Sequence, residues 1–212
     1  MTSNGISQIH APAKLNLNLR VTGRRDDGYH LLDSVVVFTD FGDWIKLGPA
    51  QEDSVAVKGD FASSVGTGKD NICFRALAAF RDHGGLTGCH SITIDKRIPV
   101  GAGLGGGSSD AAVILRYLNR TSPTPLAERR LAEAALSLGA DVPVCLAGIA
   151  QRMQGIGDML TPVDPVPHGH LVLAKADAML PTAEVFKSLR ESGSGDAAPL
   201  RSCEISGAVA DI

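Results

Sequence analysis

The chain has 212 residues, of which 44% are hydrophobic and 4% aromatic, and its formal net charge is −3. This length and apolar content predict one substantial hydrophobic core, or one core and a smaller second one. The slightly acidic charge gives no electrostatic footprint for a nucleic acid, and the few aromatic residues disfavour a base-stacking surface. We therefore expect a globular protein that does not bind nucleic acid.

The sequence also lacks the usual signs of a secreted or membrane protein. Residues 1–10 contain no apolar signal-peptide segment, and no apolar run approaches the roughly 20 residues that a membrane-spanning helix needs. The four cysteines are scattered and form none of the close pairs typical of a zinc site. We expect a cytoplasmic protein with reduced thiols and no membrane partner, as a monomer or weak homodimer.

The first part of the chain is predicted to form strands. Apolar and polar residues alternate over residues 15–21, which predicts a strand that begins after Pro12, because proline is rarely tolerated in a central strand. Further strands are expected at 31–38, 44–47 and 53–58, with a turn at 40–43.

Helices dominate the middle of the chain. We expect Asp70 to cap a helix that continues to about residue 83, followed by a strand at 90–95. Ser108, Ser109 and Asp110 are expected to cap a helix at 109–119. Thr124 followed by Pro125 predicts the start of another helix, which ends at Gly139.

The organisation changes after about residue 160. Pro162, Pro165 and Pro167 mark a linker, and a strand at 171–174 and a short helix at 182–190 are expected after it. We predict an N-terminal domain at 1–160 and the start of a second domain at 161–212. Strands and helices without a regular βαβ repeat indicate the α+β class.

A glycine-rich loop at 101–107 is the most unusual segment, since five of its seven residues are glycine. It lies between the predicted 90–95 strand and the next helix. Free N–H groups and the positive end of the helix dipole would there face an anion such as a phosphate. A plain turn needs only one or two glycines, so we interpret the loop as a phosphate site.

Two common nucleotide-binding signatures do not explain this loop. Gly101, Gly103 and Gly106 match the dinucleotide-binding pattern, but residues 121–126 lack the acidic residue expected about twenty positions on. Residues 63–70 are similar to a Walker A motif, but Ser63 replaces its first glycine and neither Ser nor Thr follows Lys69.

Residues 99–109 resemble instead the phosphate-binding loop of the galactokinase, homoserine kinase, mevalonate kinase and phosphomevalonate kinase (GHMP) superfamily, and more narrowly that of the diphosphocytidyl-methylerythritol kinase family. The resemblance implies a two-domain α+β GHMP-kinase fold, whose N-terminal domain is similar to the ribosomal protein S5 domain 2-like fold. It also implies the ATP-binding residues Pro99, Gly101, Gly103, Leu104, Gly105, Gly106, Gly107, Ser108 and Ser109, with Asn71 (in the segment 66–71) and Lys96 near the adenine.

Two residues outside the loop are candidates for catalysis. Phosphoryl transfer needs a positioned hydroxyl and a proton acceptor, and Asp141 lies between a predicted helix end and an apolar run. Lys14, at the entry of a predicted strand, is its natural partner. From the residues alone, two alternatives remain open: Asp141 could simply cap a helix, and Lys14 could be an ordinary surface lysine. Residues 12–16 and 139–143 match motifs of the family, which implies that Lys14 and Asp141 form a catalytic pair.

The resemblance also implies a substrate site for a cytidine nucleotide. Residues 26–30 and 181–186 are similar to the family's substrate segments, in which Tyr29 and Phe186 would enclose the cytosine. His30 would hydrogen-bond the base. From the residues alone, the alternative that Tyr29 and His30 have only a structural role remains open. Asn16 and Thr182 complete the implied substrate-binding residues, and 154–158 would form a turn beside the substrate diphosphate.

The resemblance therefore implies an ATP-dependent kinase that uses Mg²⁺ and phosphorylates the C2 hydroxyl of a cytidine-bearing methylerythritol in the non-mevalonate isoprenoid pathway. The metal ligands are left open. Two departures from the family pattern matter: Asp110 stands where some relatives carry Asn, and the C-terminal domain is expected to be incomplete, since its glycine-rich motif is missing. Another small-molecule kinase of the superfamily, or an inactive nucleotide-binding protein, remains an alternative.

Overall fold

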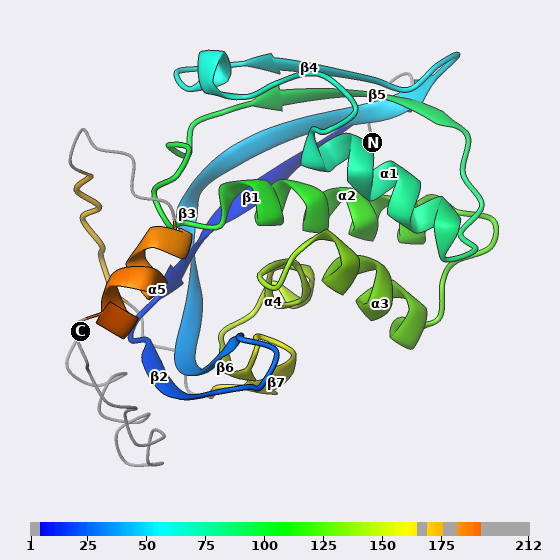
Figure 1. The fold of residues 1–212 in the computed structure, drawn as a ribbon. Coiled ribbons are helices and arrows are strands. Elements are labelled where there is room, and N and C mark those ends of the chain that lie inside the picture. The colour runs from blue at the N-terminus through cyan, green and yellow to red at the C-terminus, as the bar shows by residue number, and fades with distance from the viewer. Residues whose placement is uncertain (1–4, 165–168, 176–181, 192–212) are drawn as a thin grey trace. The chain divides into compact units, whose positions relative to one another are not determined.

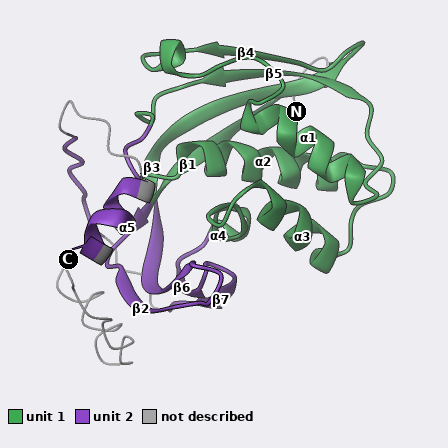
Figure 2. Cartoon of the chain, viewed as in Figure 1, with its two compact units in different colours: residues 1–14, 39–100, 104–148 green, residues 15–38, 101–103, 149–212 purple. Residues whose placement is uncertain are grey.

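The computed structural model describes residues 5–164, 169–175 and 182–191, and the chain divides into two compact units (Figures 1 and 2). Unit 1 comprises residues 1–14, 39–100 and 104–148, and unit 2 comprises 15–38, 101–103 and 149–212. The long strand β3 (His30–Ala50) runs through both units. The mixture of helices and strands confirms the predicted α+β class, and the predicted domain boundary at 160 stays a prediction.

Unit 1 contains a sheet made of segments that lie far apart in the sequence. Most of β1 (Ser7–Asn16) and the second half of β3 belong to it, together with β4 (Ser54–Lys58) and β5 (Cys89–Asp95). Strand β5 pairs antiparallel with β3 and parallel with β4, and β1 pairs with β3. The predicted strands at 53–58 and 90–95 are confirmed.

Four helices complete unit 1 and lie together on one side of its strands (Figure 2). The central helix α2 (Gly106–Thr121) contacts α1 (Ile72–Asp82), α3 (Glu128–Leu138) and α4 (Val142–Ala147), and a 3-10 turn, η1, spans Ala62–Ser64. Residues 109–115 of α2 are all buried, because this helix packs against three other helices. Of the helices in the described ranges, none has both the length and the apolar content to cross a membrane.

Unit 2 contains the first half of β3 together with β2 (Arg20–Arg24), β6 (Gln151–Gly155) and β7 (Met159–Pro162). Strand β3 pairs antiparallel with β2 and with β6, and β6 pairs antiparallel with β7. The guanidinium of Arg152 donates two hydrogen bonds to the buried carboxylate of Asp33, at 2.8 and 2.6 Å. The turn predicted at 154–158 is present at 156–158, between β6 and β7, where Ile156 N–H donates to Asp158 Oδ1.

The predicted strand at 15–21 is wrong in both of its boundaries. Strand β1 starts at Ser7, contains Pro12 and ends at Asn16, and β2 begins only at Arg20. Pro12 is tolerated because β1 pairs with β3 alone among the described strands, so no strand on its other edge requires the N–H that proline lacks. The break follows because Asn18 leaves the strand and its side chain accepts a hydrogen bond from Val35 N–H.

The predicted turn at 40–43 is absent, since β3 continues through it. Gly42 lies so close to β1 that a Cβ atom there would be 2.8 Å from Pro12 Cα. The side chain of Asp43 is fully buried and bonded rather than solvated as in a turn. Gly42 and Asp43 are residue types common in turns, but here the glycine allows β1 and β3 to approach closely and the aspartate is a buried, hydrogen-bonded carboxylate.

Three predicted helix starts also differ from the structure. Helix α1 is capped by Asn71 rather than Asp70. Helix α2 begins at Gly106, so that Ser108, Ser109 and Asp110 lie inside it. Helix α3 begins at Glu128 rather than directly after Thr124. The predicted end at Gly139 is confirmed. Near residue 171 the predicted strand is absent, whereas the helix predicted at 182–190 is α5 (Thr182–Glu191). Pro165, Pro167 and residues 192–212 lie outside the described ranges.

Candidate active site

The two predicted catalytic residues form an ion pair in unit 1. Lys14 Nζ lies 2.9 Å from Asp141 Oδ2, although 127 positions separate the residues in the sequence. The lysine side chain is 5% exposed and the aspartate side chain 38%. The protein thus encloses the ammonium group, while a small molecule can still reach the carboxylate.

Local structure explains how each member of this pair is positioned. Lys14 is near the end of β1, and its backbone N–H donates to Leu104 O at 2.9 Å, which ties the strand to the glycine loop. Asp141 occupies the N-cap position of α4 but makes no side-chain capping bond. Asp141 is therefore at a helix N-cap, the position that the capping alternative predicted. Its carboxylate does not cap the helix, however, but accepts a hydrogen bond from Lys14.

The glycine loop presents the N-terminus of α2. Gly101, Gly103 and Gly105 all have φ between +62° and +74°, a region that non-glycine residues rarely adopt. The first helical hydrogen bond runs from Ser109 N–H to Gly105 O. The preceding N–H groups at 106–108 therefore have no acceptor within the helix, and these residues are partly exposed. This geometry provides the donors and the dipole end that a phosphate requires.

Gly105 also makes room for the side chain of Lys14. A Cβ atom on Gly105 would lie 3.1 Å from Lys14 Cβ and 3.2 Å from Lys14 Cε. The Lys14 side chain thus runs directly against the loop, so the loop and the ion pair form one arrangement.

We predict that Gly105→Ala lowers kcat up to about 100-fold, because it displaces Lys14 by a few tenths of an ångström or more. Gly103→Ala is the matched control, since Gly103 also has a positive φ but a Cβ atom there would meet no other atom within 4 Å. Steady-state kinetics at saturating ATP measure the difference. Equal losses of kcat in the two variants would assign the effect to backbone strain alone.

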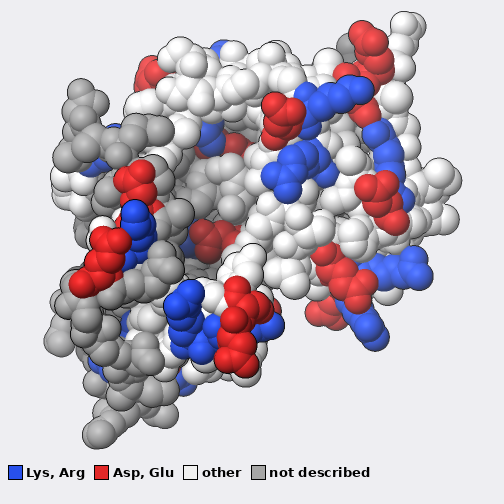
Figure 3. Space-filling view, in the orientation of Figure 1, with Lys and Arg blue, Asp and Glu red and all other residues white. Residues whose placement is uncertain are grey.

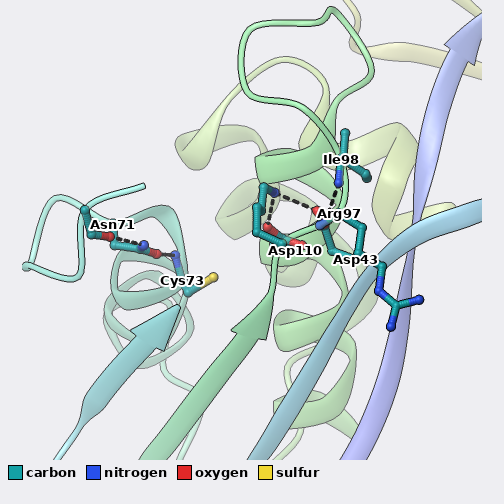
Figure 4. A network of polar contacts seen from close by, with 8 residues as sticks. Asp43, Asn71, Cys73, Arg97, Ile98 and Asp110 are labelled. Carbon is teal, nitrogen blue, oxygen red and sulfur yellow. Dashed lines mark hydrogen bonds and ion pairs between the residues drawn. The ribbon is translucent and has the colours of Figure 1, made fainter. Parts of the chain in front are cut away.

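Behind the loop, Lys96 joins two buried carboxylates in a network (Figure 4). Its Nζ lies 2.6 Å from Asp43 Oδ2 and 2.7 Å from Asp110 Oδ2. Asp43 Oδ1 accepts hydrogen bonds from Arg97 N–H at 2.6 Å and Ile98 N–H at 2.8 Å. All three charged side chains are buried, so the structure places Lys96 in an interior network rather than on an open surface.

The electrostatics of this network follow from its burial and its charges. Burial raises the pKa of Asp110 to about 7, the charge of Lys96 opposes that shift, and the charge of Asp43 adds to it. The pKa of Lys96 is raised, because the two carboxylates outweigh the effect of burial. Within this network Lys96 therefore stays cationic, and the pKa of Asp110 lies near neutral pH.

Asn71 organises the segment predicted to lie near the adenine. Its Oδ1 accepts a hydrogen bond from Cys73 N–H at 2.8 Å, which caps α1, and its Nδ2 donates to Gly66 O at 2.6 Å. One side chain thus closes the 66–71 segment onto the helix N-terminus (Figure 4).

The predicted substrate-binding residues belong to unit 2. Asn16 Nδ2 donates to Ser34 Oγ at 2.7 Å, so this amide also has a structural bond. Tyr29 follows a tight turn and is 63% exposed, which leaves its ring free to stack, and His30 opens β3. Thr182 and Phe186 lie on α5.

No sequence motif pointed to a role for Asp43, and Asp110 was expected only to cap a helix. Asp110 directly precedes five apolar residues, which is a signal of burial, whereas Asp43 is preceded by Gly42 and looks like part of a turn.

Within the described residues no group of three or more His, Cys, Asp and Glu side chains is arranged to hold a metal ion. On the face in Figure 3, basic and acidic side chains are interspersed rather than gathered into a basic patch.

Comparison with known proteins identifies relatives of this chain. Residues 71–149 match the family described as GHMP kinases N terminal domain. The 4-diphosphocytidyl-2-C-methyl-D-erythritol kinase of Paramagnetospirillum magneticum is 47% identical over 180 residues, covering 85% of this chain and 63% of the relative. The enzyme of the same name from Cereibacter sphaeroides (strain ATCC 17025) is 46% identical over 185 residues, covering 87% and 64%. The chain therefore spans less than two thirds of the length of these curated relatives.

Solved structures give a consistent result. A crystal structure of a 4-(cytidine 5'-diphospho)-2C-methyl-D-erythritol kinase matches with a TM-score of 0.75 and 32% identity, covering 96% of this chain and 71% of that one. A mevalonate pyrophosphate decarboxylase from Streptococcus pyogenes matches with a TM-score of 0.61 at 14% identity, which shows a shared fold only.

Proposed function

This chain belongs to the 4-diphosphocytidyl-2-C-methyl-D-erythritol kinase family, and from that premise we propose that it transfers the γ-phosphoryl group of ATP to the C2 hydroxyl of 4-(cytidine 5'-diphospho)-2-C-methyl-D-erythritol. The observation that carries the proposal is the Lys14–Asp141 ion pair, with Lys14 packed against the glycine loop at the N-terminus of α2. A phosphate site and a reachable carboxylate are the two parts that phosphoryl transfer to an alcohol requires.

The loop would bind and orient the triphosphate. The N–H groups at 106–108 donate to phosphate oxygens, and the positive end of the α2 dipole favours their charge. The side chains of Ser108 and Pro99, the carbonyl of Leu104 and the closed 66–71 segment belong to the same proposed ATP site. Their joint role is to hold the γ-phosphorus in line with the acceptor hydroxyl.

Asp141 and Lys14 would act on the acceptor. Asp141 accepts or orients the proton of the C2 hydroxyl, and Lys14 Nζ holds the hydroxyl oxygen and polarises the carboxylate. Because Lys14 is enclosed by protein, its positive charge acts close to the oxygen that becomes nucleophilic.

Mg²⁺ is the expected counter-cation, but the described residues offer no cluster of ligands for it. Magnesium in kinases is commonly bound through one or two carboxylates plus substrate phosphates, so most of its ligands would come from ATP and water. We assign no ligand and no catalytic step to the metal. A cytoplasmic location and a monomeric or weakly dimeric state likewise stay predictions.

A coupled ADP-release assay tests the proposed function. The 212-residue protein is given ATP, Mg²⁺ and the cytidine-bearing alcohol, and a parallel reaction contains the methylerythritol alcohol without the cytidine. We expect ADP release with the first acceptor and none above background with the second. Turnover with both acceptors would contradict cytidine specificity, and turnover with neither would contradict the kinase activity of this chain.

Substrate specificity is proposed to depend on Tyr29 and Phe186 as two aromatic walls for the cytosine, with His30, Asn16 and Thr182 as polar partners. We predict that Phe186→Ala raises KM for the cytidine substrate about tenfold or more, since base stacking contributes about 1–3 kcal/mol, and leaves KM for ATP unchanged. Val185→Ala on the same helix is the control. An unchanged KM for the cytidine substrate would remove Phe186 from the site.

A further inference from the structure

The network of Asp43, Lys96 and Asp110 lies directly behind the first turn of α2. A Cβ atom on Gly106, the first residue of the helix, would be 3.1 Å from Lys96 Nζ. Asp110 is on the following turn and is 2% exposed. Figure 4 shows Asp43 and Asp110 converging from a strand and a helix onto the same position. Any charge in this network therefore acts on whatever binds at the α2 N-terminus.

The network has one carboxylate more than it has cations. With both aspartates ionised, its net charge is −1, and burying an uncompensated charge is unfavourable. Both oxygens of Asp43 have donors, whereas Asp110 Oδ1 has no hydrogen-bond partner within the described part of the chain. A proton in the network would therefore bind to Asp110, whose protonated carboxyl can form a hydrogen bond with Asp43.

Two buried thiols also interact electrostatically with Asp110. They are Cys73 of α1 and Cys145 of α4. Burial raises the pKa of Cys145 to about 12 and the pKa of Cys73 well above its usual value, so both thiols are neutral at pH 7. Neither thiol therefore exchanges a proton near neutral pH, and Asp43 and Lys96 are the charged groups that act on Asp110.

We propose that Asp110 takes up a proton from solvent when ATP binds at the N-terminus of α2, so that the network changes from a net charge of −1 to neutral. The proposal rests on the ATP-binding role assigned to this helix above. A polyphosphate at the helix end places negative charge near a buried carboxylate, where the low dielectric strengthens repulsion between like charges. Protonation removes that repulsion, so Asp110 is a positioning residue that acts on ATP through the helix.

The sign of the pH dependence follows by linkage. The ATP complex binds more protons than the free protein, so the affinity for ATP falls as pH rises above about 7. If ATP raises the pKa of Asp110 by about one unit, the affinity falls about tenfold between pH 6 and pH 9, and about half a proton is taken up at pH 7.5.

Isothermal titration calorimetry with ATP and excess Mg²⁺ at pH 7.5 tests this, with HEPES and Tris buffers to reveal proton exchange through their different ionisation enthalpies. The wild-type protein should take up about half a proton more than Asp110→Asn, which keeps the shape and removes the titration. Asp43→Asn should also reduce the uptake, because it removes the like charge that favours protonated Asp110. Asp53→Asn, which alters a carboxylate paired with Arg81 instead, should behave as wild type.

The outcomes separate this proposal from the proposed function. ATP binding with equal proton uptake in wild type and Asp110→Asn overturns the proton coupling and leaves the kinase assignment intact. No ATP binding by the wild-type protein overturns both. If Asp110→Asn does not fold, Asp43→Asn tests the proposal, and proton uptake equal to that of the wild type would overturn it. A binding enthalpy of the wild-type protein that does not depend on the buffer would also overturn it.

Discussion

Replacing Asp141 by Asn is expected to lower kcat by roughly 10²–10⁴-fold, the usual contribution of general-base assistance. The amide keeps the shape of the carboxylate but cannot accept the hydroxyl proton. Because the Asp141 side chain caps no helix, the substitution removes no capping bond from α4. We expect the affinity for ATP and for the cytidine substrate to change by less than about tenfold, or about 1.4 kcal/mol.

Single-turnover kinetics and equilibrium binding measure the two effects separately. Asp53→Asn is the matched control, since it also removes an ion-paired carboxylate of unit 1, the partner of Arg81. It should lower the stability of the protein and leave kcat nearly unchanged. Near-normal kcat in Asp141→Asn would refute the proposed role of Asp141.

Lys14→Met should have the second-largest effect, a loss of kcat of roughly 10²–10³-fold, as expected when one preorganised donor to a developing anion is removed. Methionine retains the apolar stem against Gly105, so the loss reports the ammonium group rather than packing. The experiment is a comparison of kcat for Lys14→Met, Asp141→Asn and the double variant.

If the two residues act as a unit, the double variant should lose little more activity than the worse single variant. Multiplicative losses would show that Lys14 and Asp141 contribute independently, which would contradict a catalytic pair. Thermal unfolding of each variant verifies that the losses do not come from unfolding.

Much of the candidate site could be predicted because its signals are local. Five glycines within seven residues favour a backbone with repeated positive φ, and the N-terminus of the helix that follows has free N–H groups that can bind an anion. The motifs around Lys14 and Asp141 pointed to their pairing through the family resemblance, and the 2.9 Å contact confirms that the two side chains meet.

Other features depended on contacts that no local pattern contains. Pro12 lies within a strand because that strand has only one partner among the described strands, and residues 40–43 continue β3 because Gly42 meets β1 and Asp43 is buried by the backbone at 97–98. The start of α2 was misplaced by three residues because Ser108, Ser109 and Asp110 are good capping residues, yet Gly105 takes the N-cap position.

The sequence by itself determined the α+β class, from its order of strand and helix patterns, and the family, from the resemblance of its glycine-rich loop and of the motifs around Lys14 and Asp141. Only the tertiary structure decided that Lys96 is buried between Asp43 and Asp110, and that Asp110 has an oxygen without a partner among the described residues behind that loop. The physical reason is that the energy of a charge depends on which distant segments enclose it, and β3, β5 and α2 meet only in the folded chain.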